Sequence, residues 1–575
     1  MLLIALEFWW GYSRAKRGTG HNTYRLNDAI NSISLGMLSQ ISGILTKLLS
    51  VGIYTAVFSV VAIYPDLAFW NTWYGMLLAL VFYDLCYYWN HRFGHEVAVF
   101  WGAHVVHHQS QQYNLSTALR QTSSGALLGW IFYIPMAVAG VPPVVFGIVA
   151  IIDLLYQFWV HTEQVGKLGW FDRVFCSPSN HRVHHAVNDP YIDKNYGGVL
   201  ILWDRLFGTF EEEKEKCVYG TRGMLNSWDP LWANIDTYAG LIRHSKATQH
   251  WRDKVLIWLK PPGWLPDDLA RANTKPPFTL ADVKVYNPPL STAQQWFATA
   301  QFGLMLVAVS LFLWVADSLS FPHAAICCVA ISSGIWALGR FMQSQFGMLE
   351  VLMVEAAACA CLSAIGLLPW FMLFKPSVMA IGIVLIALHI LRGRHGTGSP
   401  ARLGLGLLLG AIVFSLAGDV FLMLPGDFFI PGLASFLVAH IFYIVLFKQD
   451  SPWFASRKAL AMVGGIGLLM FAILWSNLPE AALKAAVAAY VSVISLMVAQ
   501  AIGRAGSQQN NSARWVAWGA GIFMLSDTMI AVNKFLIPIP MADLWILATY
   551  YAAQIIIMHH ILKMLNPIEN GFKYK

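Results

Sequence analysis

The sequence predicts an all-α, polytopic membrane protein made of two helical domains. The chain has 575 residues, of which 57% are hydrophobic and only 12% are charged, whereas soluble domains carry about 25% charged residues. Apolar runs recur along the chain, and about 20 such residues suffice for one helix to cross a bilayer. We expect a histidine-rich domain over residues 1–297, linking helices over 298–348 and a second membrane domain over 349–575.

The apolar runs give the expected helices in chain order. The run over 33–64 is too long for one straight span, so either a tilted helix or a broken pair fits it. A span over 73–89 follows. Residues 126–160 are interrupted by Gly-Val-Pro-Pro at 140–143, which predicts a hairpin of two spans. Further spans are expected near 298–316, 322–341, 349–373, 376–392, 403–424, 431–447, 459–476, 480–502, 514–532 and 545–563.

Charge and cysteine usage narrow the class of protein. The formal charge of +7 is explained by basic loops on the cytoplasmic side and needs no nucleic-acid partner. The seven cysteines form no CxxC pair, so no disulfide framework is expected.

A hairpin over 126–160 places the segments 91–125 and 161–297 in one compartment. Because both are rich in Lys and Arg, that compartment is the cytoplasm, next to a bacterial inner membrane or the endoplasmic reticulum.

Nine of the 18 histidines fall between residues 91 and 185. Eight of them form one HxxxH and two HxxHH clusters, and residues three or four apart share one helix face. Neutral imidazole is a ligand for Zn, Fe, Cu and Ni. Eight clustered imidazoles are too many for one tetrahedral zinc ion. The sequence therefore predicts two metal ions. The candidate ligands are His91, His95, His104, His107, His108, His161, His181, His184 and His185.

Two other interpretations of the histidines compete with a site for two metal ions. Scattered core or surface histidines would not recur in three clusters, and a zinc hydrolase would normally carry a glutamate inside the motif, as in HExxH. His161 lies outside the clusters but ends the returning helix, and Gln157 one turn before it can orient it. Polar neighbours of the clusters can bind a polar cofactor or a head group, or simply cap a helix at the interface. They are Glu96, Asn114, Arg120 and Gln121.

The apolar second half also carries polar side chains inside its expected spans. Intramembrane carboxylates are costly and mark functional candidates, and Asp419 and Asp527 can serve as acid and base in a hydrolysis. Interhelical hydrogen bonds, an ion path in a transporter, or an inert membrane anchor are the alternatives. The other candidates are Lys375, Ser415, His440, Tyr443, Ser526, Tyr550, Tyr551 and Gln554.

The first half resembles a known superfamily. The motifs HRFGH, WGAHVVHHQSQQYNLSTALRQT, YQFWVHTE and PSNHRVHHAVNDPYIDKNYGGVLILWDRLFGTF are similar to the fatty acid hydroxylase/sterol desaturase superfamily, and within it to alkylglycerol monooxygenases, over roughly residues 1–340. The resemblance implies a di-iron (Fe) centre held by the nine histidines, O₂ as oxidant and a tetrahydropterin as possible electron donor. Gln157 stands where many members have a histidine, which favours this subfamily over sterol desaturases.

The same resemblance implies a reaction. Hydroxylation of the carbon next to an ether oxygen gives a hemiacetal, which collapses to a fatty aldehyde and a free glycerol hydroxyl. An ether lipid is then the substrate, the membrane supplies it, and the identity of the electron donor stays open. A sterol or fatty acyl substrate is the alternative within the superfamily.

The second half resembles the membrane lysoplasmalogenases over roughly residues 350–565. The motifs are KPSVM, FSLAGDVFLML, FLVAHIFYIVLF, GAGIFMLSDTMIAVNKF and YYAAQIIIMHH. The resemblance implies hydrolysis of a lysoplasmalogen vinyl ether to an aldehyde, through protonation of the enol-ether carbon by a buried carboxylic acid. By that resemblance the site candidates are Lys375, Asp419, His440, Asp527, Tyr550 and Gln554.

Overall fold

The chain folds almost entirely into helices. The computed structural model describes residues 1–272, 276–392 and 399–565, and within these residues it contains two isolated β-bridges but no strand. The chain divides into two compact units. The first comprises Met1–Cys328 with Leu338–Gln345, and the second comprises Val329–Ala337 with the chain from Phe346 onward. The predicted all-α fold class is therefore confirmed.

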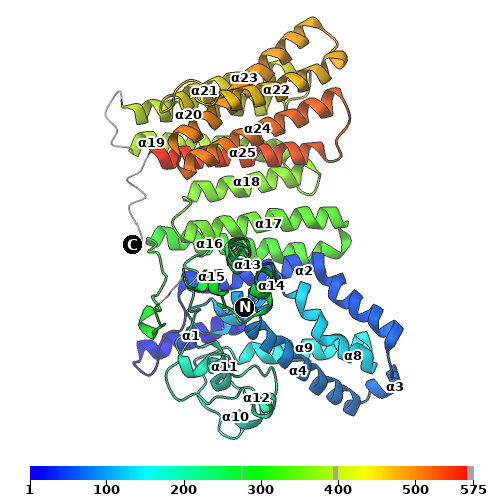
Figure 1. The fold of residues 1–575 in the computed structure, drawn as a ribbon. Coiled ribbons are helices and arrows are strands. Elements are labelled where there is room, and N and C mark those ends of the chain that lie inside the picture. The colour runs from blue at the N-terminus through cyan, green and yellow to red at the C-terminus, as the bar shows by residue number, and fades with distance from the viewer. Residues whose placement is uncertain (273–275, 393–398, 566–575) are drawn as a thin grey trace. The chain divides into compact units, whose positions relative to one another are not determined.

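The first unit is built from helices of very different length (Figure 1). They are α1 (Leu2–Lys16), α2 (Leu26–Val61), α3 (Leu67–Trp70), α4 (Trp73–Glu96), α5 (Ala98–His108), α6 (Leu115–Ala118), α7 (Gly125–Leu128), α8 (Ile134–Ala139), α9 (Pro143–Trp159), α10 (Phe171–Val174), α11 (Pro178–His185), α12 (Leu202–Phe207), α13 (Pro230–Ala247), α14 (Trp251–Leu259), α15 (Asp267–Ala270) and α16 (Thr292–Val315).

Local sequence signals set the ends of the helices that carry histidines. The Thr72 hydroxyl caps α4 by accepting a hydrogen bond from the Gly75 amide at 3.1 Å. Val97 is extended and separates α4 from α5. Ser177 caps α11 through the Asn180 amide, and Pro178 occupies the first helical position, where its missing N–H costs nothing. Both HxxxH and HxxHH motifs are therefore helical, as their spacing predicts.

The break in the apolar run over 126–160 is confirmed. Gly140 ends α8 in the left-handed region at φ +100°, and α9 begins at Pro143. The two apolar pieces, Gly125–Ala139 and Pro143–Trp159, are each shorter than the roughly 20 residues of a full crossing. The expectation that each piece is a full span is therefore not confirmed. The span expected over 73–89 is not confirmed, because α4, which contains it, is not among the described helices that are apolar enough to cross a membrane. This helix continues to Glu96 and so carries His91 and His95.

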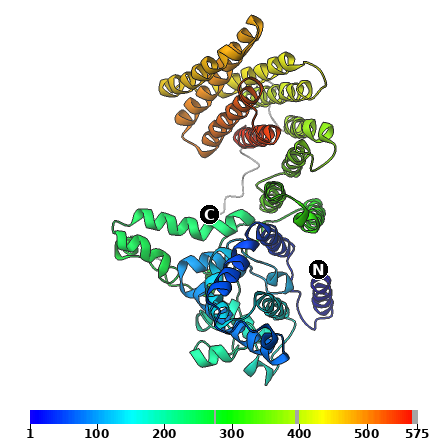
Figure 2. The same cartoon turned by 90° about the vertical axis from the view of Figure 1, so that its right-hand side faces the viewer.

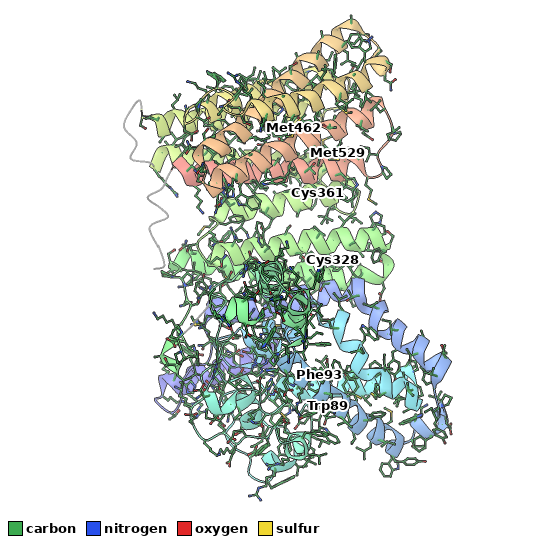
Figure 3. The ribbon with its side chains drawn as sticks, in the orientation of Figure 1. Trp89, Phe93, Cys328, Cys361, Met462 and Met529 are labelled. Carbon is green, nitrogen blue, oxygen red and sulfur yellow. The ribbon has the colours of Figure 1, made fainter. Side chains whose placement is uncertain are left out.

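The second unit is a bundle of long helices (Figure 2). They are α18 (Met348–Ala364), α19 (Phe371–Arg392), α20 (Pro400–Phe421), α21 (Phe429–Lys448), α22 (Arg457–Leu474), α23 (Ala481–Gln508), α24 (Asn511–Phe535) and α25 (Ala542–Leu565), while α17 (Phe321–Met342) contributes to both units. Within the bundle α24 packs against α25 and α20 against α21. Cys361 of α18 lies partly buried against the bundle's apolar core (Figure 3).

Nine helices of the described chain are long and apolar enough to cross a membrane, namely α16, α17 and α19–α25. The pair Leu26–Thr46 and Val51–Val61 is bent by 44°, a geometry that fits either a broken span or a re-entrant loop. A broken pair is one of the two forms expected for the run over 33–64. The protein is thus a multi-span membrane protein. The span expected over 349–373 is wrong in length, because Gly366, at φ +76°, and Pro369 follow the end of α18 at Ala364.

Gly36 lies where α2 closely approaches the backbone that follows α6. A methyl group built on Gly36 would come 2.3 Å from the carbonyl oxygen of Leu119, whereas at Gly43 of the same helix it would meet no described atom within 4 Å. We expect Gly36→Ala to destabilise the protein by about 1–3 kcal/mol, since the backbone must shift. Gly43→Ala should be neutral or slightly stabilising. Thermal unfolding in detergent measures both, and equal midpoints would contradict this packing.

Candidate functional site

The structure brings all nine predicted histidines together in the first unit. They form two groups, and within each group one ring nitrogen per residue lies within 4.8 Å of the others. All nine come from α4, α5, α11 and the residue two positions beyond α9. The first group contains His91, His95, His104, His108 and His184, and the second group contains His107, His161, His181 and His185.

Helix geometry decides which histidine joins which group. Each i, i+4 pair stays in one group, as His104 and His108 do. The i+3 histidine of each HxxHH motif, His107 or His184, joins the other group. Positions i+3 and i+4 differ by about 100° around a helix, so adjacent histidines point to different centres. One HxxHH helix therefore contributes to both groups.

Four ring orientations are fixed by backbone carbonyl groups. The Nδ1 atoms of His91, His107, His161 and His184 lie 2.8, 2.9, 2.8 and 3.0 Å from the carbonyl oxygens of Tyr196, Arg120, Gln157 and Lys194. A carbonyl oxygen only accepts, so these Nδ1 atoms carry the proton and each Nε2 presents a lone pair. This is how proteins hold imidazoles that bind metals.

The spacing of the ring nitrogens fits a metal ion. The Nε2 atoms of His107 and His161 are 3.1 Å apart, although both rings have their proton on Nδ1 and two lone pairs repel. Two nitrogens each about 2.1 Å from one ion, at a right angle, are about 3.0 Å apart. The same 3.1 Å separates His91 from His104 and His161 from His181. The donor set therefore has the spacing that a bound cation requires.

Burial favours the neutral form of several of these imidazoles. It lowers the pKa of His107 to about 4 and also lowers the pKa values of His184 and His185. A neutral imidazole is the form that binds a metal. At pH 7 these three histidines therefore do not need to lose a proton before they bind.

Buried carboxylates brace the loop behind the first group, and the sequence analysis did not identify them. Asp84 of α4 accepts hydrogen bonds from the amides of Val199 and Leu200 at 2.7 and 2.9 Å. Asp204 accepts from the Tyr196 amide at 2.7 Å, and the Tyr196 carbonyl in turn holds His91. An acidic residue in an apolar helix just before HxxxH was a usable signal for Asp84.

Arg182 ties the third cluster to two other segments. Its guanidinium donates to both carboxylate oxygens of Glu213, at 2.8 and 2.7 Å, and to the carbonyl oxygens of Thr162 and Val165. Burial alone would raise the pKa of Glu213, but Arg182 outweighs burial and the pKa is lowered. The ion pair thus fixes α11 beside the segment that follows His161.

A cavity of about 780 Å³ opens beside the histidines. Four of the nine line it, together with apolar side chains of α2, α4, α9 and α16 such as Met37, Tyr83 and Val309. This volume falls in the range of pockets that bind small organic ligands. On the outer side of α4, Trp89 and Phe93 (Figure 3) lie with ring centroids 6.4 Å apart. The cavity is thus an apolar space whose wall includes the candidate metal ligands.

The residues predicted to bind a cofactor or a head group have different surroundings. Glu96 pairs with Arg92 at 2.9 Å. Asn114 caps α6, which agrees with the expected alternative of a helix cap. Its side-chain amide donates to the Thr23 carbonyl. Arg120 is 1% exposed and donates to protein oxygens, including the Val106 carbonyl at 2.7 Å. Of the four only Gln121 lines the cavity among the described residues.

Gln157 supports His161 through its backbone, not through its side chain as the sequence suggested. The Gln157 carbonyl oxygen lies 2.8 Å from Nδ1 of His161. Its side chain instead accepts a hydrogen bond from the Tyr87 hydroxyl at 2.7 Å and donates to Asp153. Asp153, which is 2% exposed and lines the cavity, is a further buried acid that the sequence analysis missed.

The second unit places its predicted polar residues in two hydrogen-bonded sets. In one set the Tyr550 hydroxyl donates to Asp419 at 2.8 Å, and Lys375 lies near enough to interact with that carboxylate. Gln554 joins this set through a side-chain hydrogen bond with Tyr550. Its amide also donates to Ser415 at 2.9 Å and accepts from the Tyr443 hydroxyl. The Tyr551 hydroxyl donates to the Lys375 carbonyl. Ser526 is separate and binds the Ile546 carbonyl.

The other set surrounds Asp527. His440 Nε2 lies 3.3 Å from the Asp527 carboxylate, and the Tyr490 hydroxyl donates to the same carboxylate oxygen. Tyr490 was missed by the sequence analysis, although a tyrosine inside an apolar span is a signal of the same kind. Asp527 and Tyr490 line a cavity of about 70 Å³. Phe523 contacts both His440 and Tyr550, with ring centroids 4.8 and 5.5 Å apart, and so lies between the two sets.

Comparisons with known proteins match the two halves separately. Residues 76–209 match the fatty acid hydroxylase family, and residues 370–561 match the YhhN family. Over 286 residues, 49% of this chain and 63% of the relative, it is 38% identical to an alkylglycerol monooxygenase of Homo sapiens. Over 373 residues it is 33% identical to that of Danio rerio, covering 63% of this chain and 80% of the relative.

The C-terminal half has its own relatives. It is 32% identical over 188 residues to lysoplasmalogenase TMEM86A of Bos taurus, which covers 31% of this chain and 74% of the relative. No solved structure matches the chain. The chain therefore belongs to the alkylglycerol monooxygenase family, and its C-terminal part belongs to the family of the TMEM86 lysoplasmalogenases.

Proposed function

We propose that the protein is a bifunctional membrane enzyme of ether-lipid breakdown. Its first unit hydroxylates the ether-linked carbon of alkylglycerols with O₂, and its second unit hydrolyses the vinyl ether of lysoplasmalogens. Each activity releases a fatty aldehyde. The observation that carries the first activity is the pair of histidine groups beside a 780 Å³ apolar cavity. The relatives, an alkylglycerol monooxygenase and a lysoplasmalogenase, support the choice of substrates.

The two histidine groups would hold two iron ions. Bound iron would supply the activation of O₂ that insertion into a C–H bond requires, with a tetrahydropterin as the electron donor. The protein positions the metal-binding imidazoles and the lipid chain. The backbone carbonyls fix the imidazoles, burial favours the neutral form of several of them, and the apolar cavity excludes water and accommodates the alkyl chain. Polar side chains in the cavity wall, Asn90, Gln121 and Gln157, are available to the glycerol end of the lipid.

The second unit would work by acid catalysis. A carboxylic acid protonates the enol-ether carbon, and water captures the resulting oxocarbenium ion. Asp527 lines a cavity and is oriented by Tyr490 and His440, while Asp419 is held by Tyr550 beside Lys375. We assign the two carboxylates to the acid and base roles as a pair. The histidine groups would face the cytoplasm, since the segments around them are rich in Lys and Arg.

The test combines metal content with product analysis. The purified protein should hold about two irons, since each histidine group offers enough ligands for one ion, and it should release aldehyde from an alkylglycerol under O₂ and tetrahydropterin. Chelation should abolish that release and leave vinyl-ether hydrolysis unchanged, because the described residues of the second unit contain no cluster of metal-binding side chains. Zinc in place of iron with no O₂ dependence would overturn the oxygenase. Iron with product only from sterols or acyl lipids would overturn the substrate assignment.

A further inference from the structure

Four aromatic side chains lie directly against the histidine groups. The ring centroid of Tyr87 is 5.2 Å from that of His91. The ring centroids of Trp101 and Tyr196 are 5.1 and 5.4 Å from that of His95. Tyr113 lies 5.2 Å from His185. At such distances each ring can exchange an electron with a centre that the histidines hold. The aromatic rings differ in the side chains that they contact next, and these contacts distinguish Tyr113 from the others.

Tyr113 begins a continuous path to the surface. Its ring stacks on that of Tyr219, with centroids 5.0 Å apart and planes 16° from parallel. The Tyr219 hydroxyl donates to one carboxylate oxygen of Glu163 at 2.9 Å, and the other oxygen lies 2.9 Å from Nε2 of His21. Tyr113 is 1% exposed, whereas the His21 side chain is 66% exposed. The path therefore runs from a buried metal-site histidine to solvent.

Proton acceptance distinguishes Tyr219 from the three tyrosines that lie against the histidines. The Tyr87 hydroxyl donates to the side-chain amide oxygen of Gln157, which is not a base. A phenol that loses an electron also releases its proton, so its oxidation is favoured where a base accepts that proton. The buried Tyr196 hydroxyl has no hydrogen-bond partner among the described residues. The Tyr113 hydroxyl donates to the Val160 carbonyl, which is not a base. Tyr219 donates to a carboxylate, and a radical is therefore best stabilised there.

We propose that Tyr113 and Tyr219 form an exit path that carries oxidising equivalents from the metal centre to the surface when O₂ reacts without lipid. This rests on the proposed function, since it needs iron that reacts with O₂. One electron passes from Tyr219 through the Tyr113 ring and reduces the oxidised centre by one equivalent. The phenol proton moves to Glu163, leaving a neutral tyrosyl radical. A thiol or ascorbate-type reductant in solution then returns one electron and releases its own proton to solvent, while Glu163 returns the phenol proton to Tyr219.

The direction of the path follows from the chemistry of phenols. A phenol is a weak reductant, so the path does not feed electrons into the resting centre for normal turnover. It competes only when a strongly oxidising centre finds no C–H bond to attack. The side chains that need this protection are the buried imidazoles themselves, because they are the nearest oxidisable groups to the centre.

The test is electron paramagnetic resonance of rapidly frozen samples. Iron-loaded, reduced protein without lipid is mixed with O₂, and wild type should give a neutral tyrosyl radical. Tyr219→Phe keeps the ring and should remove the signal, while Glu163→Gln keeps both rings and should weaken it several-fold. Tyr191→Phe is the matched control. Tyr191 belongs to the same apolar cluster, but its hydroxyl binds the backbone of Lys214 and Glu215, so its loss should leave the signal unchanged.

Iron content, measured first, separates this inference from the proposed function. A wild-type protein that binds no iron contradicts the proposed function and the path with it. Iron-loaded wild type without a tyrosyl signal, or an undiminished signal in Tyr219→Phe, overturns the path alone. Repeated exposure to O₂ without lipid gives a second readout. Tyr219→Phe should lose aldehyde-forming activity several times faster than wild type, and equal rates of loss would also overturn the path.

Discussion

Replacing His108 with alanine is expected to abolish aldehyde release from alkylglycerols. His108 occupies the centre of the first group, with its Nε2 3.1 Å from those of His95 and His104 and 3.2 Å from that of His184. Its ring also stacks on His185 of the second group at 4.3 Å. Losing an outer partner of a metal ligand typically costs about 10- to 100-fold in affinity or activity, so losing His108 itself should cost more than about 100-fold.

The measurement is aldehyde formation together with bound iron, and the control is another histidine. His250→Ala removes an exposed imidazole of the same unit and should leave both quantities unchanged. His108→Ala should lower the iron content and still hydrolyse vinyl ethers at the wild-type rate, because the second unit keeps its own site. A His108→Ala protein with full iron and full aldehyde release would refute the metal-centre assignment.

The histidine site was accessible to sequence reasoning because helix periodicity is local. Spacings of three and four residues place His91 with His95 and His104 with His108 on common faces without any knowledge of the fold. The break at residues 140–143 adds that the chain returns, which brings His161 to the same region. Two metal ions were predicted, but the assignment of each histidine to a group was not. That assignment follows from the same periodicity once the histidines of α5 and α11 are known to lie together.

What the sequence could not supply is long-range pairing. Asp84 braces a loop more than a hundred residues away, at the Val199 amide, and nothing local indicates that contact. The role predicted for Gln157 was partly wrong for the same reason. Its position one turn before His161 suggested a side-chain contact, but the helix presents the carbonyl there and directs the amide toward Tyr87 and Asp153.

Long-range pairing was also not predictable from the sequence in the second unit. Polar residues in apolar spans identified Asp419 and Asp527, but their partners lie on other helices, as Tyr550 and Tyr490 do. The length of one helix was also mispredicted, because hydropathy over 349–373 continues past Gly366, where the backbone turns. Hydropathy measures burial in lipid or in protein, whereas the backbone decides where the helix ends.

Asp527→Asn is expected to lower vinyl-ether hydrolysis by about 10²- to 10⁴-fold, the usual contribution of a general acid or base. The amide keeps an oxygen that can accept the Tyr490 hydrogen bond, so the packing around the 70 Å³ cavity should persist while the ability to give or take the proton is lost. Asp419→Asn should have an effect of the same kind, since its carboxylate is buried and held by Tyr550. Aldehyde release from a lysoplasmalogen measures both.

The controls separate chemistry from folding and from the first unit. Asp427→Asn changes an exposed acid in the loop between α20 and α21 and should hydrolyse at the wild-type rate. Oxygen-dependent release from an alkylglycerol should stay unchanged in all three variants, because the histidine groups lie in the other unit. Full hydrolysis in both Asp527→Asn and Asp419→Asn would remove the acid–base mechanism. If ion movement across vesicles then depended on these carboxylates, they would line a transport path, since a buried charge in a span must serve some polar partner.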